Sequence, residues 1–460
     1  MQTAFVPLSS VLPESRAAPR TPARSAKSRG RAVTPSRSAT GVAGHMALVS
    51  FRFAMGSSLA ASAGGAAPAA APRLEFAPAA IGAPASDFGR PLVTNVQIVD
   101  LDRDGLPDVL YCEAQLNTVR WLRQSPRGVF VERTIAEGIR GPAHVWAADV
   151  NGSGRLDVLV ASMGQISPNN DRIGAVVALE NVDPRTFRPH VLLAGVARVS
   201  DVRAANFSGH RDGKLDLVVG QFGYAQGETR WMRNLGGWRF ESKIVNTQSG
   251  CVHTPVADFD GDGRPDFVAL VSQEWEEIHL FRGDGRGKFA ASLVWGSTNE
   301  DYGSSGLTVC DLNRDGRPDI LYTNGDGFGP AVTPGPRPWH GVQWLENLGG
   351  GNFRFHRICD LPGAYSPVGV DLDGDGATDV VAVAAYAGRN LPGNVSPSLV
   401  WFRNDGRQGF EPRVIASAPK DLITLAAGDF DGSGRVALVT GGFYVAAPYV
   451  SMGRITRWRR

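Results

Sequence analysis

Acidic side chains recur along this chain at fixed spacing within a nine-residue motif. Five copies carry oxygen-bearing side chains at positions 1, 3, 5 and 9 and a glycine at position 6. The copies begin at Asp100, Asp149, Asp258, Asp311 and Asp371 and end at Asp108, Asp157, Asp266, Asp319 and Asp379. Alternate residues of a tight loop turn inward together, and the glycine permits the sharp bend. The pattern therefore predicts loops that each gather four oxygen atoms around one point.

Such a loop has the chemistry of a calcium site. Calcium prefers oxygen ligands at this density, whereas magnesium retains its waters and zinc favours His or Cys. Two carboxylates at close range repel by about 1 kcal/mol in water and by about 4 kcal/mol at an effective dielectric constant near 20. A bound cation converts that repulsion into coordination. We therefore predict Ca2+ as the cofactor, at about five sites, three to four of them strong. The alternative, a solvated Asp-Gly hairpin turn, is disfavoured because five copies keep the same oxygens.

The predicted ligands differ between loops in their number of charges. They are Asp100, Asp102, Asp104 and Asp108; Asp149, Asn151, Ser153 and Asp157; Asp258, Asp260, Asp262 and Asp266; Asp311, Asn313, Asp315 and Asp319; and Asp371, Asp373, Asp375 and Asp379. The three loops with four Asp should bind best, followed by the loop at 311 and then the loop at 149. Two worn copies, at 206–216 and 429–437, should bind weakly or not at all, because the first has an insertion and the second ends in Ala437.

The residues around each loop predict the elements that hold it. A short β-branched run follows each loop, such as DVLYCE after 107 or DFVALV after 265, and predicts a strand. About 20 residues after each loop comes a strand–turn–strand hairpin, which contains Trp121, Trp231, Trp344 or Trp401 in four of the repeats. These tryptophans could form a carbohydrate platform, but packing between blades is the favoured interpretation. Four strands per repeat and seven repeats predict an all-β, seven-bladed β-propeller of four-stranded antiparallel blades.

The two ends of the repeat region predict how the ring closes. The last repeat ends with GRITRWRR, which supplies a third strand and no fourth. The segment PRLEFAPAAIG before the first repeat is similar to the fourth strands of the other repeats. We expect residues near Leu74–Ile81 to complete the last blade beside the C-terminus, which removes open sheet edges.

The loop motif together with the W-x-x-N-x-G-x-x-F hairpin resembles the FG-GAP/VCBS repeat family. That family includes the calcium-bearing propeller of integrin α subunits and many secreted bacterial proteins. The resemblance covers about residues 73–460, and it is closer to the bacterial VCBS type because a literal FG element stands clearly only at Phe222–Gly223. It implies calcium-stabilised blades, with recognition on the face opposite the calcium loops. It does not imply a single activity, because one fold hosts many functions.

Charge is distributed unevenly over the chain. The net charge is +2, but residues 1–45 carry seven Lys/Arg against one Glu. Because the basic part is a Ser/Pro/Arg-rich tail and not a patch on the fold, nucleic-acid binding is not expected. The chain has no apolar run long enough to span a membrane as a helix.

Residues 1–72 have a non-globular composition. They could be a disordered leader, an organellar transit peptide, or an export signal that begins at Met46 and ends near Ala67–Ala71. Export to a secreted or periplasmic location is favoured, because modest calcium sites fill outside the cytosol. Cys112, Cys251, Cys310 and Cys359 are irregularly spaced and allow one unassigned disulfide.

Two further features could carry function. The loops Ser162–Ile173, Thr323–Gly341 and Tyr386–Ser398 are long and lie on the face opposite the calcium loops, and the middle one contains Trp339 and His340. Five positions before each calcium loop stand the residues Asn95, His144, Asp201, His253, Gly306, Ser366 and Thr424.

We expect this second set to form a largely polar ring near the channel mouth. There His144, Asp201 and His253 could converge as an acid/base group, a metal site or a sugar-binding rim. A solvated channel lining is the favoured alternative, so no catalytic residue is assigned.

The sequence thus predicts a calcium-stabilised recognition or scaffold propeller. Its expected partner is a protein or a polysaccharide, held on the face opposite the calcium loops, and its oligomeric state is left open. The alternative is a carbohydrate-active enzyme, of lyase or dehydratase type, with its site at the channel mouth.

Overall fold

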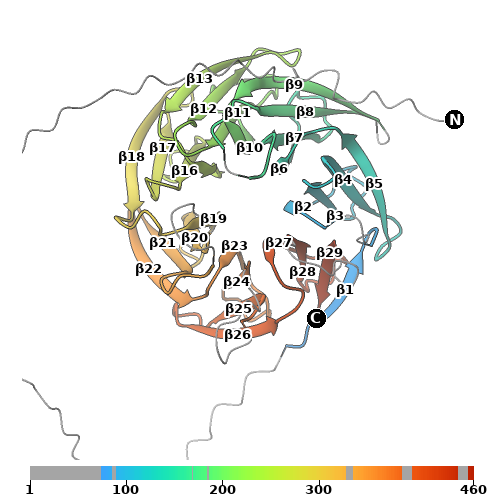
Figure 1. The fold of residues 1–460 in the computed structure, drawn as a ribbon, viewed down its shortest axis with the longest axis vertical. Helices are drawn as coiled ribbons and strands as arrows, with labels where there is room; N and C mark the ends of the chain where they lie inside the picture. Colours follow the sequence, from blue (N-terminus) through green and yellow to red (C-terminus); the bar gives the residue numbers. More distant parts are fainter. Residues whose placement is uncertain are drawn as a thin grey trace, which may run out of the picture. The chain divides into compact units, whose positions relative to one another are not determined.

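Seven antiparallel sheets arranged as blades around a central axis make up the computed structural model (Figure 1). The structure describes residues 74–84, 90–167, 169–183, 186–327, 335–385, 396–443 and 454–460. In these ranges the regular structure is entirely β-strand. The all-β, seven-bladed fold that the repeats predict is confirmed.

Within each blade the strands follow one another from the central channel to the outer rim. Blade 1 contains β2 (Val93–Val99), β3 (Asp108–Glu113), β4 (Thr118–Gln124) and β5 (Phe130–Glu137); blade 2 contains β6 (Pro142–Ala148), β7 (Asp157–Ser162), β8 (Gly174–Asp183) and β9 (Thr186–Val196). Blade 3 contains β10 (Arg198–Ala205), β11 (Asp216–Phe222), β12 (Thr229–Asn234) and β13 (Phe240–Asn246); blade 4 contains β14 (Cys251–His253), β15 (Val256–Ala257), β16 (Asp266–Val271), β17 (Glu277–Gly283) and β18 (Phe289–Gly296). Blade 5 contains β19 (Ser304–Cys310), β20 (Asp319–Asn324), β21 (Gly341–Gly349) and β22 (Asn352–Asp360); blade 6 contains β23 (Ala364–Val370), β24 (Asp379–Ala384), β25 (Leu399–Asn404) and β26 (Phe410–Ala416). Blade 7 contains β27 (Leu422–Gly428), β28 (Ala437–Gly442), β29 (Ile455–Arg459) and β1 (Ala77–Ile81).

The last blade is closed by β1, the first strand of the described residues. β1 pairs antiparallel with β29, in a register that runs from Ala77 opposite Arg459 to Ile81 opposite Ile455. Figure 1 shows this pair at the lower right of the ring, where the blue β1 lies beside the dark red β29. The predicted closure by residues near Leu74–Ile81 is confirmed, and it leaves β29 paired on both sides.

The core lies between neighbouring blades. The second strand of every blade is buried along its whole length, apart from the last residue of β11, as its continuous apolar run predicts. The repeated tryptophans are at most 3% exposed, and the rings of Trp121 and Trp231 contact Phe187 and Phe289 of the following blades. The tryptophans therefore serve as packing between blades, and they are too buried to form a carbohydrate platform.

The innermost strands share an irregularity that aims one side chain sideways. In every blade the pairing register shifts at or just before the ring position, for example between Val93 and Asn95 or between Pro142 and His144. Such a bulge bends the strand and redirects the side chain that follows it. In blade 4 the inner strand is interrupted as well, because Pro255 has no N–H to donate between β14 and β15.

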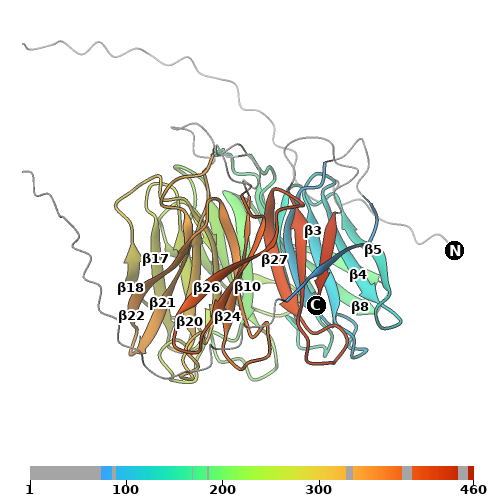
Figure 2. The same cartoon turned by 90° about the horizontal axis from the view of Figure 1, so that it is seen from below.

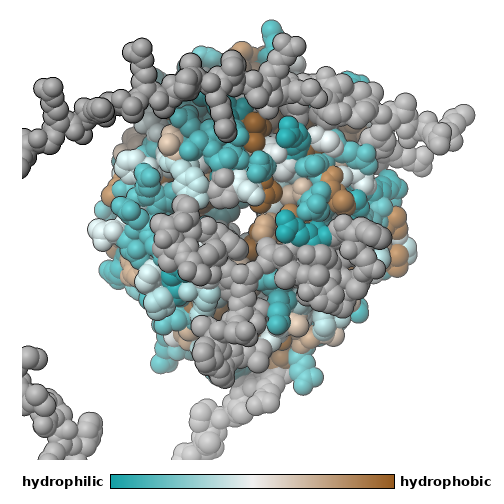
Figure 3. Space-filling view, viewed as in Figure 1, coloured by the Kyte–Doolittle hydropathy of each residue, from teal (hydrophilic) through white to brown (hydrophobic). Residues whose placement is uncertain are grey.

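The loops gather on two opposite faces of the ring, which Figure 2 shows edge-on. The acidic loops and the turns between third and fourth strands lie on one face, because both connect the same strand ends. The other face is seen in Figure 3, where hydrophilic side chains predominate around a narrow central opening and hydrophobic ones lie along part of its edge.

Some sequence predictions concern residues outside the described ranges, and others are tested within them. Residues 1–72 lie outside them, so the domain boundary at residue 73 and the export signal stay predictions. Within the described part of the chain, no helix is long and apolar enough to cross a bilayer. The four cysteines are free thiols, so the disulfide that the sequence allowed is not formed.

Candidate metal loops and channel ring

The first carboxylate of each acidic loop closes the loop on itself. Asp100 accepts hydrogen bonds from the backbone N–H groups of Asp104 (3.0 Å) and Gly105 (2.8 Å). Gly105 has φ +85°, a conformation that favours glycine, which explains the glycine at position 6. The loops that begin at Asp149, Asp258, Asp311, Asp371 and Asp429 form the same contact with their own position 6.

The last carboxylate ties the loop to the third strand of its blade. Asp266 is fully buried and accepts the N–H groups of Phe259 (2.9 Å) and Gly283 (2.7 Å). Asp108, Asp157, Asp319 and Asp379 accept the equivalent pairs of N–H groups. A carboxylate has about four lone-pair sites, so this role leaves room for a cation.

Burial makes the carboxyl groups at position 9 weaker acids than usual. It raises the pKa of Asp108, Asp157, Asp266, Asp319 and Asp379 to about 6. The other carboxylates of the loops add to this effect, because like charges disfavour ionisation. A divalent cation at the loop would oppose both effects and keep the carboxylates ionised.

Three loops bring at least three carboxylate oxygens within 4.8 Å of one another. The groups are Asp100, Asp102 and Asp108; Asp258, Asp260 and Asp262; and Asp371, Asp373 and Asp379. They belong to the three loops that the sequence ranks highest. In the first group Oδ1 of Asp102 is buried and has no hydrogen-bond partner. An all-oxygen donor set with an unpaired buried oxygen fits a hard cation such as calcium.

Two of these three loops also hold an arginine that sequence reasoning missed. The guanidinium of Arg123 in β4 contacts Asp102 through Nε (2.5 Å) and Asp104 through Nη2 (2.8 Å). In β25 Arg403 makes the same fork with Asp373 (2.7 Å) and Asp375 (2.5 Å).

The loop at 258 differs, because its third-strand arginine turns away. Arg282 makes no ion pair in the described part of the chain, and its Nε is buried without a partner. Instead Arg264, from the loop itself, pairs with Asp262 and donates to the carbonyl of Gly283. Among the residues that the structure describes, Asp260 has no cationic partner.

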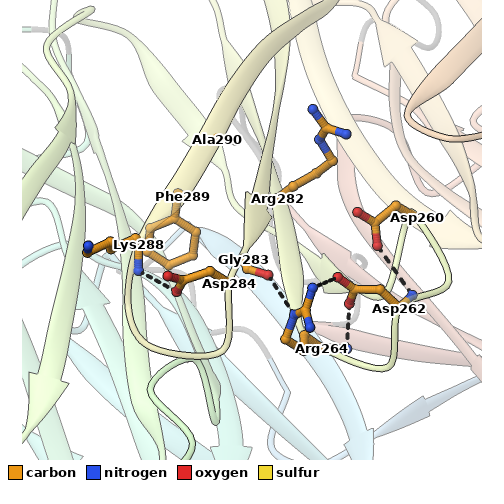
Figure 4. A pocket seen from close by; sticks show the side chains of 9 residues that line it. All are labelled: Asp260, Asp262, Arg264, Arg282, Gly283, Asp284, Lys288, Phe289 and Ala290. Atoms are coloured by element: carbon orange, nitrogen blue, oxygen red, sulfur yellow. Dashed lines mark hydrogen bonds and ion pairs between the residues drawn. The ribbon is translucent and has the colours of Figure 1, made fainter.

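An open pocket of about 430 Å³ adjoins this loop (Figure 4). It lies between the 258 loop and the turn that joins β17 to β18. Figure 4 shows Asp260 and Asp262 on one side and Asp284 and Lys288 on the other. The carboxylates of Asp260 and Asp262 are therefore accessible from solvent.

In two of the weaker loops, the carboxylates are bound by other side chains of the same loop. In the 206–216 copy, Asp216 accepts from the hydroxyl of Ser208 (2.6 Å) and lies 3.0 Å from Nε2 of His210. This copy is therefore closed by its own side chains. In the loop at 311, Arg317 pairs with Asp315 and donates to the carbonyl of Asn347 (2.6 Å).

On the channel side, the structure brings together the three residues that the sequence singled out. Nδ1 of His144 lies 2.9 Å from Oδ1 of Asp201, and Nδ1 of His253 lies 4.0 Å from Oδ2. Arg203 also contacts Asp201 (3.1 Å), and the N–H of Thr254 donates to it (2.7 Å).

The charges in this cluster are strongly perturbed. Burial alone would raise the pKa of Asp201, but Arg203 and His144 hold it well below its usual value. Burial and the neighbouring Arg203 lower the pKa of His144 to about 4. Asp201 is 0% exposed and His144 is 4% exposed, so neither presents its polar atoms to a large substrate.

The same cluster is part of a complete ring of contacts between blades. Asn95 accepts the N–H of Val145 and Thr424 accepts the N–H of Val96. The remaining junctions are His144 with Asp201, Asp201 with Thr254, His253 with the carbonyl of Ser305, Ser305 with the carbonyl of Ala364, and Ser366 with the carbonyl of Ile423. Each of the seven blade junctions thus has a polar contact beside the channel.

The long loops are described only in part, because residues 168, 328–334 and 386–395 lie outside the described ranges. Of the two residues singled out there, His340 is 1% exposed, and its Nδ1 accepts the N–H groups of Arg337 and Gly363. Nε1 of Trp339 donates to the carbonyl of Asp301 (2.8 Å). These contacts hold the C-terminal part of this loop against blade 5 and the segments that flank it.

Comparison with known proteins agrees with this architecture. A family model described as FG-GAP-like repeat matches residues 100–160, 211–269, 258–322 and 371–440, which together exceed half of the chain. Integrin alpha pat-2 of Caenorhabditis briggsae is 28% identical over 216 residues, which are 41% of this chain and 17% of that protein. The chain thus spans well under two thirds of this relative's length.

A solved structure is similar in fold alone. The virginiamycin B lyase of Staphylococcus aureus superposes with a TM-score of 0.52 at 9% identity, over 84% of this chain and 100% of the lyase chain. At this identity the similarity supports the propeller architecture and carries no inference about activity.

Proposed function

Since this chain belongs to the FG-GAP-like repeat family, we propose that it is an extracellular or periplasmic recognition propeller whose blades are stabilised by calcium. The observation that supports the calcium part most directly is the repeated grouping of three carboxylates within 4.8 Å in three separate loops. Clustered like charges are unfavourable without a cation, and extracellular calcium is abundant enough to fill modest sites.

The residues that would hold calcium are the oxygens at positions 1, 3, 5 and 9. Calcium supplies positive charge to them and no chemistry of its own. Asp258, Asp260 and Asp262 form the most accessible group, and the fully buried Asp266 orients the loop from the side of the third strand. Magnesium should stabilise the blades less than calcium does, because magnesium dehydrates reluctantly.

The proposed ligand is a protein, bound on the face opposite the metal loops. The likeness to an integrin alpha chain supports a protein ligand and an extracellular setting. On this face the turn between β16 and β17 presents Trp275, which is 42% exposed, and the turn between β3 and β4 presents Leu116, which is 43% exposed. Exposed aromatic side chains are enriched in binding surfaces.

The geometry does not favour the carbohydrate-active alternative. Its candidate residues His144 and Asp201 are buried and belong to the ring of contacts between blades. A role in holding neighbouring blades together accounts for their positions without a substrate.

Binding to an array of purified extracellular proteins and surface polysaccharides tests the recognition role. The chain is applied in calcium buffer beside two variants, Trp275→Ala and the outer-rim control Ile244→Ala, which is 47% exposed in the wild type. We expect binding to at least one protein that Trp275→Ala weakens and Ile244→Ala does not. Binding to polysaccharides alone, or equal binding by both variants, would contradict the proposed face and partner.

A further inference from the structure

The acidic loops differ in which arginine side chains contact their carboxylates. In the loops at 100 and 371, the third-strand arginines Arg123 and Arg403 each bridge the carboxylates at positions 3 and 5. Both forks use Nε for position 3 and Nη2 for position 5, so two separate blades repeat one geometry. Paired N–H donors that face two carboxylates make charge-assisted bonds, which are the stronger class of hydrogen bond.

Third-strand and loop residues vary together across the five complete copies of the loop. Where position 3 is Asp, in the loops at 100, 258 and 371, the third strand carries Arg123, Arg282 and Arg403. Where position 3 is Asn, at 149 and 311, it carries a glutamate instead. These glutamates, Glu180 and Glu346, pair with the outer strand, through His190 and His356 at 2.8 Å. A carboxylate at position 3 is therefore accompanied by a cation on the third strand.

The residue at position 7 differs between the loops with and without a fork. The loops at 100 and 371 have Leu106 and Ala377 there, and the third-strand arginine reaches the loop. In the loop at 258, Arg264 stands at position 7 and occupies the outer oxygen of Asp262. Arg282 then makes no bond to the loop.

The forks also cover the oxygens that a cation would need. Asp102 and Asp373 have side chains only 6% and 8% exposed, and an arginine donates to each. An ion that coordinates both position 3 and position 5 must share these two carboxylates with a positively charged guanidinium, which already occupies one oxygen of each. Asp260 has no such competitor and faces the pocket of Figure 4.

We propose that Arg123 and Arg403 are tethered counter-cations that compete with a divalent ion for the loops at 100 and 371, so that the loop at 258 fills first. This inference rests on the proposed calcium function and refines it. It replaces the equal ranking of the three four-Asp loops by an order of affinity. The two arginines act by occupying ligand oxygens and not by coordinating the metal.

Calcium titration by isothermal calorimetry of the full chain tests the order of filling. Asp260→Ala should abolish the tightest binding event and leave weaker ones. In that background Arg123→Gln and Arg403→Gln should each tighten one remaining event by about ten-fold, as expected when a charge-assisted bond no longer competes. Arg123→Lys, which keeps the charge and loses the fork, should tighten binding by less.

Matched controls separate competition from a general change of charge. Arg133 and Arg413 lie in the fourth strands of the same blades, over the rings of Trp121 and Trp401, and contact no loop carboxylate. Arg133→Gln and Arg413→Gln remove the same charge and should leave calcium affinity within about two-fold of the background, because they free no ligand oxygen. Circular dichroism confirms that each variant is folded.

The outcomes distinguish this inference from the function on which it rests. Calcium binding whose affinity is unchanged by Arg123→Gln and Arg403→Gln, or changed equally by the controls, overturns the inference and leaves the calcium function intact. Absence of calcium binding in every variant, with the arginine variants included, overturns both.

Discussion

At the scale of single residues, Asp201 has a buried and closely contacted environment. Its carboxylate is fully buried and is contacted by His144, Arg203 and Thr254 from three blades. An ionised carboxylate tolerates such burial only when charges and N–H donors compensate its lost hydration. The cluster therefore has a structural role that its titratable residue types do not reveal.

Removing this carboxylate should be costly. Asp201→Ala leaves the guanidinium of Arg203 and the N–H of Thr254 without their acceptor, and we expect a loss of about 3–5 kcal/mol in the free energy of unfolding. Urea denaturation measures this loss. Asn95→Ala removes a single contact at another blade junction and should cost about 1 kcal/mol. Equal, small losses for both would contradict a central role of Asp201 in the ring.

A second buried carboxylate should make stability depend on pH. Burial raises the pKa of Glu276 to about 7, although it accepts hydrogen bonds from Ser304 and Gly303. A folded pKa above the unfolded value of about 4.5 means that its contribution is complete below pH 4.5 and is lost as pH rises through about 7.

Comparison with a neutral variant isolates that contribution. Relative to Glu276→Gln, the wild type should lose roughly 2–3 kcal/mol of unfolding free energy between pH 4.5 and pH 8. Denaturation curves at several pH values, with calcium held constant, give the difference. A difference that is independent of pH, or that grows in favour of the wild type toward high pH, would show that Glu276 is not protonated in the fold.

At the scale of the element, the acidic loop combines two functions in one motif. Position 9 fastens the loop to the third strand and is fully buried, whereas position 5 is exposed. The fastening hydrogen bonds exist without any ion. The motif is therefore both a hairpin connection and a candidate metal site.

Substitutions at positions 9 and 5 should distinguish the structural role of the loop from its role in metal binding. In chelator, Asp319→Ala should lower the free energy of unfolding by roughly 2–4 kcal/mol, because the N–H groups of Leu312 and Asn347 lose their acceptor. Asp315→Ala should cost little in chelator but should reduce the gain on adding calcium. Thermal melts with and without calcium distinguish these effects. If both variants behave alike in chelator, position 9 has no separate structural role.

Most features of the acidic loops can be predicted from the sequence. The loops, the strands that flank them and the three best carboxylate groups follow from positional oxygens and apolar runs. The forks of Arg123 and Arg403 do not, because they depend on which rotamer the arginine adopts after the hairpin folds. A usable signal was present, however, in the pairing of Asp at position 3 with Arg on the third strand, and of Asn with Glu.

For the channel ring, the sequence predicts the position of the residues but not their contacts. The polar residue five positions before each loop is regular in sequence, and it predicts a ring. Sequence alone does not show that a bulge in the strand turns these side chains toward the neighbouring blade, or that Ser305 makes the contact in blade 5, where the ring position is Gly306. Polar residue types thus indicated the location correctly, while the bulges determine what these residues contact.

At the scale of the whole molecule, closure depends on one short strand. β1 covers the otherwise open edge of β29, and Ile81 packs into the cluster between blades 7 and 1. A chain that comprises residues 82–460 should melt at least roughly 10 °C lower and aggregate through the exposed edge. A chain that comprises residues 73–460 retains β1 and should melt like the full chain. Equal melting of the two would contradict closure by β1.

Calcium held by the acidic loops should stabilise the ring. Elemental analysis of the purified chain, together with its melting midpoint in EDTA, in calcium and in magnesium, tests this stabilisation. We predict bound calcium, a lower midpoint in EDTA, and recovery that is greater with calcium than with magnesium. Purified protein that contains no calcium and melts identically in all three buffers would contradict the account.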